Sequence, residues 1–187
     1  ERADSLIWDA HKMMRVPALC TAVLYKKYNS QINTFQQKGS YVFHEGDVIG
    51  MDSMPFTVEC TKSALGTKLY WSFALEGEKS ISVFVEKSFQ QARNLYKYLN
   101  EHPDFYCPYV PESNILCFQF RPDILSNKQQ LELRYKLIET GDFYITSCEV
   151  QGKRYLRTVL MNPLSQKKEY KALVDKIKEI ADKIIKD

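Results

Sequence analysis

Hydrophobic and polar positions in the middle of the chain follow helical spacing. Between residues 78 and 100 the apolar side chains recur every three or four positions, at Ile81, Val85, Phe89, Ala92, Tyr96 and Leu99. This spacing predicts an amphipathic helix over 78–100. A separate helix is expected just before it, over 61–76, because Gly77 is a typical residue at which a helix stops.

The rest of the chain is predicted to hold short strands and two further helices. Strands are expected over 5–8 and 18–25, followed by an irregular loop over 29–58. Three prolines within nine residues mark a junction to a second unit, at Pro103, Pro108 and Pro111. That unit is predicted to run as strand 114–120, helix 126–139, strand 142–149, strand 152–161 and helix 166–186, with a hairpin turn at Gln151–Gly152.

Composition excludes several classes of protein. The 187 residues are 44% hydrophobic and 26% charged, which is ordinary for a globular chain. The formal charge of +3 is small and the basic residues are interspersed with acids, so we expect no nucleic-acid partner. No apolar run approaches the ~18 residues of a membrane span, so we expect no membrane partner. Five cysteines without a CxxC pair favour a reducing, cytoplasmic location.

Generic catalytic and metal-binding motifs are missing from the sequence. It has no glycine-rich phosphate loop, HExxH or GxSxG. Its three histidines, His11, His44 and His102, are too far apart for metal-ligand spacing, so no metal is expected. These observations alone support nothing more specific than an α/β protein.

One segment is more informative. Residues 3–14 read ADSLIWDAHKMM and are followed by Val16, Pro17 and Cys20. This sequence resembles the cofactor-lysine segment of the group II pyridoxal-phosphate-dependent amino-acid decarboxylases, and most closely the glutamate and cysteine-sulfinate decarboxylase branch. The resemblance continues in order along essentially the whole chain, through residues 40–43, 59–62, 68–69, 157–159 and 162–163.

The resemblance implies an α/β fold, the C-terminal part of the type I pyridoxal-phosphate-dependent transferase fold. Residues 1–102 would be the end of the large, cofactor-binding domain, with the lysine and a mobile loop. Residues 103–187 would be the small C-terminal α+β domain. The family's active site lies at a dimer interface, so a homodimer is also implied.

The resemblance also assigns residues to roles. Lys12 would form the Schiff base with pyridoxal 5'-phosphate, the internal aldimine, because a lysine amine reacts with the cofactor aldehyde. His11, Asp9 and Cys60 would bind the cofactor, although Asp9 is equally well explained as a structural cap and Cys60 as an inert buried residue. Arg157 would bind the substrate carboxylate through its planar fork, with a peripheral salt bridge as the alternative.

Departures from the family pattern affect what the protein is expected to do. The loop over 44–57 contains no tyrosine, where the family has the acid that protonates the reaction intermediate. Lys62 replaces an arginine, Leu65 stands where the closest relatives have an acid, and Arg15 replaces a glycine. Groups that the family needs on the cofactor ring and phosphate precede the lysine. We therefore expect an N-terminal portion of the same enzyme, on another chain or separated by cleavage, to be required for activity.

The predicted function is α-decarboxylation of an amino acid that is glutamate-like or otherwise linear, with the chain as part of a larger enzyme. Three alternatives stay open. The reaction could form an aldehyde or have another pyridoxal outcome. The substrate could be aromatic or 2,4-diaminobutyrate. The chain could be a non-catalytic dimerisation module that kept the fold.

Overall fold

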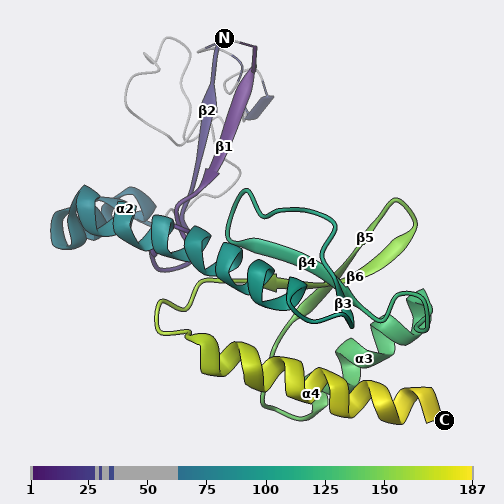
Figure 1. The fold of residues 1–187 in the computed structure, drawn as a ribbon. Helices are drawn as coiled ribbons and strands as arrows, with labels where there is room; N and C mark the ends of the chain where they lie inside the picture. The colour runs from purple at the N-terminus through teal and green to yellow at the C-terminus, as the bar shows by residue number, and fades with distance from the viewer. Residues whose placement is uncertain (1, 28–29, 31–33, 36–62, 187) are drawn as a thin grey trace, which may run out of the picture. The chain divides into compact units, whose positions relative to one another are not determined.

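A computed structural model describes residues 2–27, 30, 34–35 and 63–186 (Figure 1). The chain divides into two compact units, residues 1–81 and 82–187, which we describe separately. The elements in chain order are β1 (Ser5–Asp9), β2 (Thr21–Tyr25), α2 (Leu65–Asn100), β3 (Phe105–Tyr106), β4 (Ile115–Phe120), α3 (Asn127–Glu139), β5 (Thr146–Val150), β6 (Lys153–Val159) and α4 (Lys167–Lys186).

The first unit is built on an antiparallel pair of strands, β1 and β2, with Ser5 opposite Tyr25 and Asp9 opposite Thr21. The connection between the strands carries a small buried cluster of Ala10, Val16 and Cys20. Leu65 and Leu69, from the first turns of α2, pack against this cluster. The predicted strands 5–8 and 18–25 are therefore confirmed, the second of them starting three residues later than expected.

The helix α2 contains the break that the sequence predicts. Gly77 has φ 74° and ψ 156°, which is not a helical conformation, so two helical segments meet there. A positive φ is strained for residues with a Cβ atom, and glycine adopts it freely. The two predicted helices are thus confirmed over the described residues, with the first helix beginning at Leu65.

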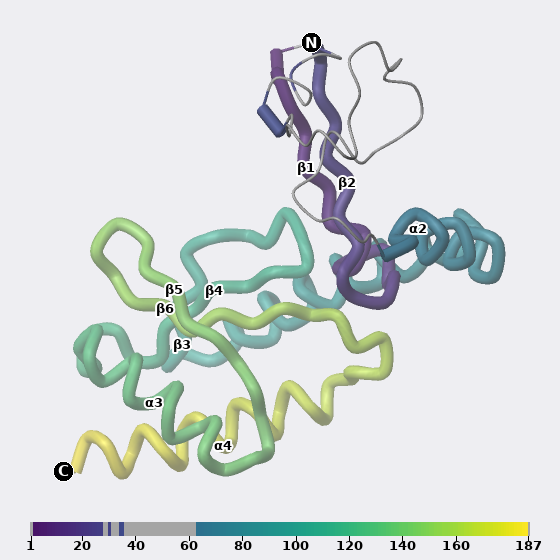
Figure 2. Tube along the Cα trace, turned by 180° about the vertical axis from the view of Figure 1, so that it is seen from behind, coloured from purple at the N-terminus to yellow at the C-terminus, as the bar shows by residue number. Residues whose placement is uncertain are grey.

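The second unit is a four-stranded antiparallel sheet in the order β3-β4-β6-β5, covered on one face by helices. Figures 1 and 2 show α3 and α4 on the same side of this sheet. The turn between β5 and β6 has positive φ at both Gln151 and Gly152, as a tight hairpin requires, which confirms the predicted turn.

Alternation along the strands decides which side chains form the core. Leu116, Phe118 and Leu156 are almost fully buried under the helices, and Ile177 of α4 packs into the same core. Leu99, near the end of α2, joins this core as well. The second half of α2 therefore packs with the sheet, and the compact units divide at 81/82. The predicted domain boundary at 102/103 stays a prediction about the complete enzyme.

Two details differ from the sequence prediction. The short strand β3 was not expected, because it has only two residues and lies among prolines, and it forms by pairing Phe105 with Phe120. The predicted strand 142–149 starts later, at Thr146, because the chain first turns through Gly141, which has φ 75°. Neither change moves a candidate site residue.

Candidate functional site

Lys12 lies in a tight connection directly after β1, and the backbone holds this connection closely. The Lys12 N–H donates to the Asp9 carbonyl oxygen at 3.2 Å, and the Arg15 N–H donates to the Lys12 carbonyl oxygen at 3.1 Å. Val16 N–H donates to the Ala10 carbonyl oxygen at 3.3 Å, and both of these side chains are buried. The backbone is fixed while the Lys12 side chain remains 63% exposed, so its amine is accessible.

Arg15 explains why the family motif has a glycine in this connection. Its φ is 60°, in the left-handed region that favours glycine. The turn keeps this conformation even with a long side chain at the position. The departure from the family pattern at Arg15 therefore leaves the course of the backbone around Lys12 intact.

Asp9 joins the end of β1 to the lysine. Its carboxylate accepts hydrogen bonds from the Lys12 amine and, at 2.6 Å, from the Thr21 hydroxyl of the paired strand. These two bonds, that of Lys12 first, hold the pKa of Asp9 below its usual value. Asp9 is thus charged at neutral pH and acts here as a partner that orients Lys12.

His11 is anchored through one ring nitrogen. Its backbone N–H donates to the Cys20 carbonyl oxygen at 3.1 Å, and its Nδ1 lies 2.9 Å from the same oxygen and 3.2 Å from the Cys20 nitrogen. Either tautomer therefore engages Nδ1 with Cys20 and leaves Nε2 without a partner among the described residues. Cys20 is itself held, since its thiol donates to the Leu65 carbonyl oxygen at 3.5 Å.

Cys20 belongs to the motif, but the sequence alone predicted no role for it. The structure shows that its backbone fixes the His11 ring and that its side chain is 5% exposed in the small core of the first unit. The spacing of nine residues gives no helical or strand signal for such a contact. Only the motif match pointed to this position.

Arg157 lies on β6 in the second unit, on the sheet face opposite the helices. Its NH1 donates to the Thr146 hydroxyl at 3.3 Å, and that hydroxyl donates to the Arg157 carbonyl oxygen at 3.1 Å. No carboxylate among the described residues forms an ion pair with Arg157, so the predicted alternative of a peripheral salt bridge is not what this part of the chain shows. The rest of its fork is available for an anion.

Two cysteines flank Arg157 on the same face. Cys117 is its neighbour on β4, and the Cys117 and Cys148 sulfurs lie 3.5 Å apart as free thiols. Burial, followed by the contact with Cys148, raises the pKa of Cys117 to about 11, while the charge of Arg157 acts in the opposite direction. A neutral thiol next to the guanidinium leaves the positive charge of Arg157 uncompensated.

The structure therefore brings three of the predicted site residues, Lys12, His11 and Asp9, into one connection of the first unit, and it places Arg157 in the second unit. Cys60 lies outside the described residues, as do the loop over 44–57 and Lys62. No group of three potential metal-ligating side chains occurs in the parts of the chain that the structure describes. Within those same parts, no helix is long and apolar enough to cross a membrane.

Comparison with known families identifies the chain. The model of the pyridoxal-dependent decarboxylase conserved domain matches residues 1–121. The chain belongs to this family, and the predicted family is confirmed. The matched region includes the connection with Asp9, His11 and Lys12, whereas Arg157 lies beyond it.

Curated relatives are decarboxylases of low sequence identity. Human cysteine sulfinic acid decarboxylase is 25% identical over 70% of this chain and 27% of its own length. The mouse acidic amino acid decarboxylase GADL1 is 21% identical over 94% of this chain and 35% of its own length. The L-aspartate decarboxylase dtxS4 of Metarhizium robertsii is 27% identical over 71% of this chain and 27% of its own length. The chain thus spans about a quarter to a third of these relatives.

Solved structures share the fold. The chain superimposes on Oryza sativa TDC with pyridoxal phosphate and tryptamine at a TM-score of 0.82 and 17% identity, over 98% of this chain and 40% of that one. Mouse CSAD gives a TM-score of 0.77 at 18% identity, over 96% and 40% of the two chains. Catharanthus roseus tryptophan decarboxylase gives 0.79 at 20% identity, over 97% and 39%. The predicted fold class, part of the type I pyridoxal-phosphate-dependent fold, is confirmed.

Proposed function

We propose that this chain is the part of a pyridoxal 5'-phosphate-dependent amino-acid α-decarboxylase that carries the cofactor lysine and a substrate arginine. The observation that carries the proposal is the position of Lys12. A family-matched segment presents its exposed amine from a backbone-fixed connection after β1. Membership in the pyridoxal-dependent decarboxylase family supports the cofactor, and Lys12 supplies the primary amine that an aldehyde requires.

The side chains around Lys12 suit this cofactor. When bound, pyridoxal phosphate supplies an electron sink for the negative charge left on the substrate after carbon dioxide departs. Lys12 Nζ would hold the cofactor aldehyde carbon covalently, with the aldehyde oxygen leaving as water, once the amine has given up a proton and separated from Asp9. Water screens this ion pair, because the Lys12 side chain is exposed, so breaking it is not costly. His11 would contact the cofactor through the free Nε2, and Cys60 is proposed as a further contact.

Arg157 would bind the α-carboxylate of the substrate. The absence of an ion-paired acid among the described residues and the Thr146 hydrogen bond support this role, because they leave a charged fork available in a fixed orientation. Holding the carboxylate fixes the bond that must break relative to the cofactor. The neutral thiol of Cys117 keeps a competing negative charge away from the same fork.

We propose an acidic, linear α-amino acid as the substrate. The names of three relatives support this choice, since they specify cysteine sulfinic acid, acidic amino acids and L-aspartate. Tryptamine and L-tryptophan in similar structures, and a 4-hydroxyphenylacetaldehyde synthase of the same fold, keep an aromatic substrate and an aldehyde product as outcomes to be tested. A diaminobutyrate substrate is tested in the same way.

We further propose that an N-terminal portion of the enzyme and a second copy complete the site. The strand pair supports the need for a partner, because Leu6 and Ile7, which point to opposite faces, are 56% and 67% exposed. Their neighbours on β2, Leu24 and Val23, are exposed as well. A two-stranded ribbon with apolar side chains on both faces is not stable by itself in water. The predicted cytoplasmic location stays a prediction.

The test is covalent labelling of the assembled enzyme. After incubation with pyridoxal phosphate and reduction with borohydride, we expect peptide mass spectrometry to find the cofactor on Lys12. Lys12→Ala should abolish both the label and carbon dioxide release from glutamate, aspartate or cysteine sulfinate. Lys79→Ala removes another exposed lysine and should change neither.

Product analysis separates the reaction outcomes. Release of carbon dioxide without hydrogen peroxide indicates simple decarboxylation, whereas peroxide indicates an aldehyde-forming reaction. Tryptophan and 2,4-diaminobutyrate are assayed in parallel. An assembled protein in which Lys12 stays unlabelled, and whose behaviour Lys12→Ala does not change, would refute the proposal and support a non-catalytic dimerisation module.

A further inference from the structure

Two free thiols lie in contact on the sheet face opposite the helices. The sulfur atoms of Cys117 on β4 and Cys148 on β5 are 3.5 Å apart, and both side chains are half-buried. The register places the two cysteines on either side of β6, with Cys117 opposite Arg157 and Cys148 opposite Tyr155. In the proposed decarboxylase, Cys148 has no role and Cys117 is only a neutral neighbour of Arg157.

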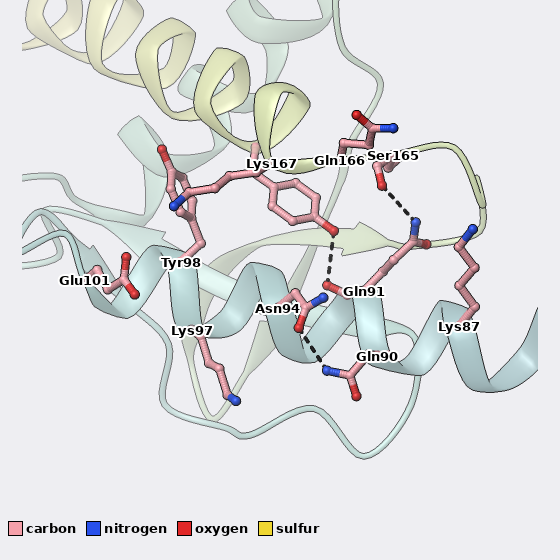
Figure 3. Close-up of a pocket in the computed structure, with 11 residues that line it drawn as sticks. Lys87, Gln90, Gln91, Asn94, Lys97, Tyr98, Glu101, Ser165, Gln166 and Lys167 are labelled. Atoms are coloured by element: carbon pink, nitrogen blue, oxygen red, sulfur yellow. Dashed lines mark hydrogen bonds between the residues drawn. The ribbon is translucent and has the colours of Figure 1, made fainter.

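The sheet holds the two sulfur atoms in place. Cys117 lies inside the ladder between β4 and β6, and Cys148 lies inside the ladder between β5 and β6. The loop that follows β6 is fastened to α2, because Gln91 Nε2 donates to the carbonyl oxygens of Asn162 at 3.0 Å and Ser165 at 3.1 Å. Figure 3 shows Gln91 and Ser165 joined in the pocket between α2 and the start of α4. The contact between the thiols therefore belongs to a packed sheet and does not depend on a loop.

A disulfide does not suit this arrangement, whereas a bridging metal ion does. Neighbouring strands lie about 4.8 Å apart, and β6 separates the two strands that carry the cysteines. A disulfide needs Cα atoms about 4.4–6.8 Å apart, so β4 and β5 would have to move together to form one. A metal–thiolate bond is about 2.3 Å long, so one ion bonded to both sulfur atoms spans up to about 4.6 Å between them. The observed separation of 3.5 Å lies within this span.

The kind and number of ligands select the metal. Thiolates are soft ligands, which favour copper(I) and zinc among the common metal ions. A structural zinc site needs four protein ligands, whereas two thiolates satisfy copper(I). Among the residues that the structure describes, no group of three potential metal-ligating side chains occurs, so this part of the chain does not complete a zinc site. The pair of thiols is therefore matched to copper(I).

Arg157 compensates the charge that such an ion would leave. Metal binding releases the protons of both thiols, so copper(I) held by two thiolates forms a singly negative group. Arg157 is the neighbour of Cys117 on the adjacent strand, and its positive charge favours the Cys117 thiolate. The same guanidinium has no carboxylate partner in the described part of the chain, so it is available to stabilise the anionic complex.

We propose that Cys117 and Cys148 bind one copper(I) ion. Each thiol gives its proton to solvent and two sulfur–copper bonds form, and neither the protein nor the metal is oxidised or reduced. The bound group is anionic and lies next to Arg157, so it competes with the substrate carboxylate for the guanidinium. This effect on the substrate rests on the proposed function of Arg157, whereas the binding of copper(I) does not.

The test is anaerobic titration of the complete, reduced protein with copper(I), with a chromogenic copper(I) chelator as competitor. Native mass spectrometry counts the ions that each variant keeps. We expect Cys117→Ser and Cys148→Ser each to hold one copper ion fewer than the unmodified protein. Cys107→Ala removes a buried cysteine of the same unit that lies outside the pair, and it should keep the ion. Thermal melting checks that the variants are folded.

Steady-state kinetics of the assembled enzyme test the competition at Arg157. Copper(I) should raise the KM for an acidic amino acid about ten-fold, because the anionic group takes over one charged hydrogen bond of the guanidinium. The Cys148→Ser variant should not show this rise. An unchanged KM in the copper-loaded enzyme would refute the competition, independently of the binding measurement.

Two results would overturn the copper site itself. The first is that the unmodified protein gives up its copper to the chelator as readily as Cys148→Ser does, since the pair would then add nothing to the affinity. The second is an equal loss of copper in Cys107→Ala and in the two serine variants, since binding would then depend on cysteines in general and not on the contact between Cys117 and Cys148.

Discussion

Replacing Arg157 by lysine tests whether the fork, and not only the charge, binds the substrate. In the structure the Arg157 NH1 donates to the Thr146 hydroxyl at 3.3 Å, which orients the guanidinium along the sheet. The other N–H groups have no carboxylate partner among the described residues. Lysine keeps the positive charge on β6 and loses the planar pair of donors that matches a carboxylate.

The size of the effect follows from the number of bonds lost. A hydrogen bond to a charged group contributes about 1.5–3 kcal/mol, and each 1.4 kcal/mol corresponds to about a factor of ten. Arg157→Lys loses one of two such bonds to the substrate, so kcat/KM should fall about 10- to 150-fold. Arg157→Met loses both bonds and the charge, so kcat/KM should fall by at least about 100-fold.

The assay is steady-state decarboxylation of an acidic amino acid by the assembled enzyme, with cofactor labelling of Lys12 measured in parallel. The label should be unchanged, because Arg157 acts on the substrate. The control is Arg154→Lys, on the same strand, where Arg154 forms an ion pair with Glu149 at 2.9 Å. Unchanged kcat/KM in Arg157→Lys, or an equal loss in Arg154→Lys, would refute the assignment of Arg157 to the substrate.

Three further predictions concern the second unit. Gln130→Leu removes the side-chain amide that forms hydrogen bonds with the buried backbone of Phe120, with its N–H at 3.3 Å and with its C=O at 2.7 Å. The free energy of unfolding, measured in urea, should therefore fall by about 3 kcal/mol, and a loss below about 1 kcal/mol would contradict this. The Arg121 guanidinium holds the pKa of Asp104 below its usual 3.8. The ion pair of Asp104 with Arg121 therefore contributes fully to stability at neutral pH, and this contribution is lost as the pH falls below about 4. Asp104→Asn should therefore reduce the difference in unfolding free energy between about pH 7 and pH 3, and an unchanged difference would show that the pair does not matter. Burial raises the pKa of Cys117 to about 11, so near pH 8 the thiol of the folded protein should be alkylated roughly 100-fold more slowly than that of the protein unfolded in urea. Mass spectrometry follows the alkylation, and equal rates in the two states would contradict the burial argument.

Local patterns predicted most of the secondary structure, because the apolar stripes and alternating strands correspond to real cores. The stripe over 78–100 is helical in the structure, and its residue Leu99 is fully buried. The strand β3 could not be predicted, since two residues carry no periodicity and form a strand only by pairing with Phe120. The boundary between the two compact units, which lies within α2, could not be predicted either, because helical spacing does not show which core a helix face joins.

The site was predictable only as far as the motif extends. Lys12, His11 and Asp9 are close in sequence, and the structure brings their side chains into one connection. The anchoring of His11 by Cys20 and of Arg157 by Thr146 depends on the register of paired strands, which a sequence pattern does not specify. Motif resemblance predicts which groups are functional, and the structure adds the residues that contact and orient them.

The two units support function in different ways. The second unit has its own core, so the orientation of Arg157 is set by a sheet that is stable through packing. In the first unit, the backbone hydrogen bonds that shape the Lys12 connection join residues between Asp9 and Cys20, and side-chain bonds tie the connection to Thr21 and Leu65 of the same unit. The apolar side chains on both faces of those strands are exposed, and the proposed partner would cover them. The turn that carries Lys12 has its own backbone hydrogen bonds, so we expect the proposed assembly to leave its course unchanged. Assembly can therefore complete the surroundings of the amine without rebuilding the turn that carries it.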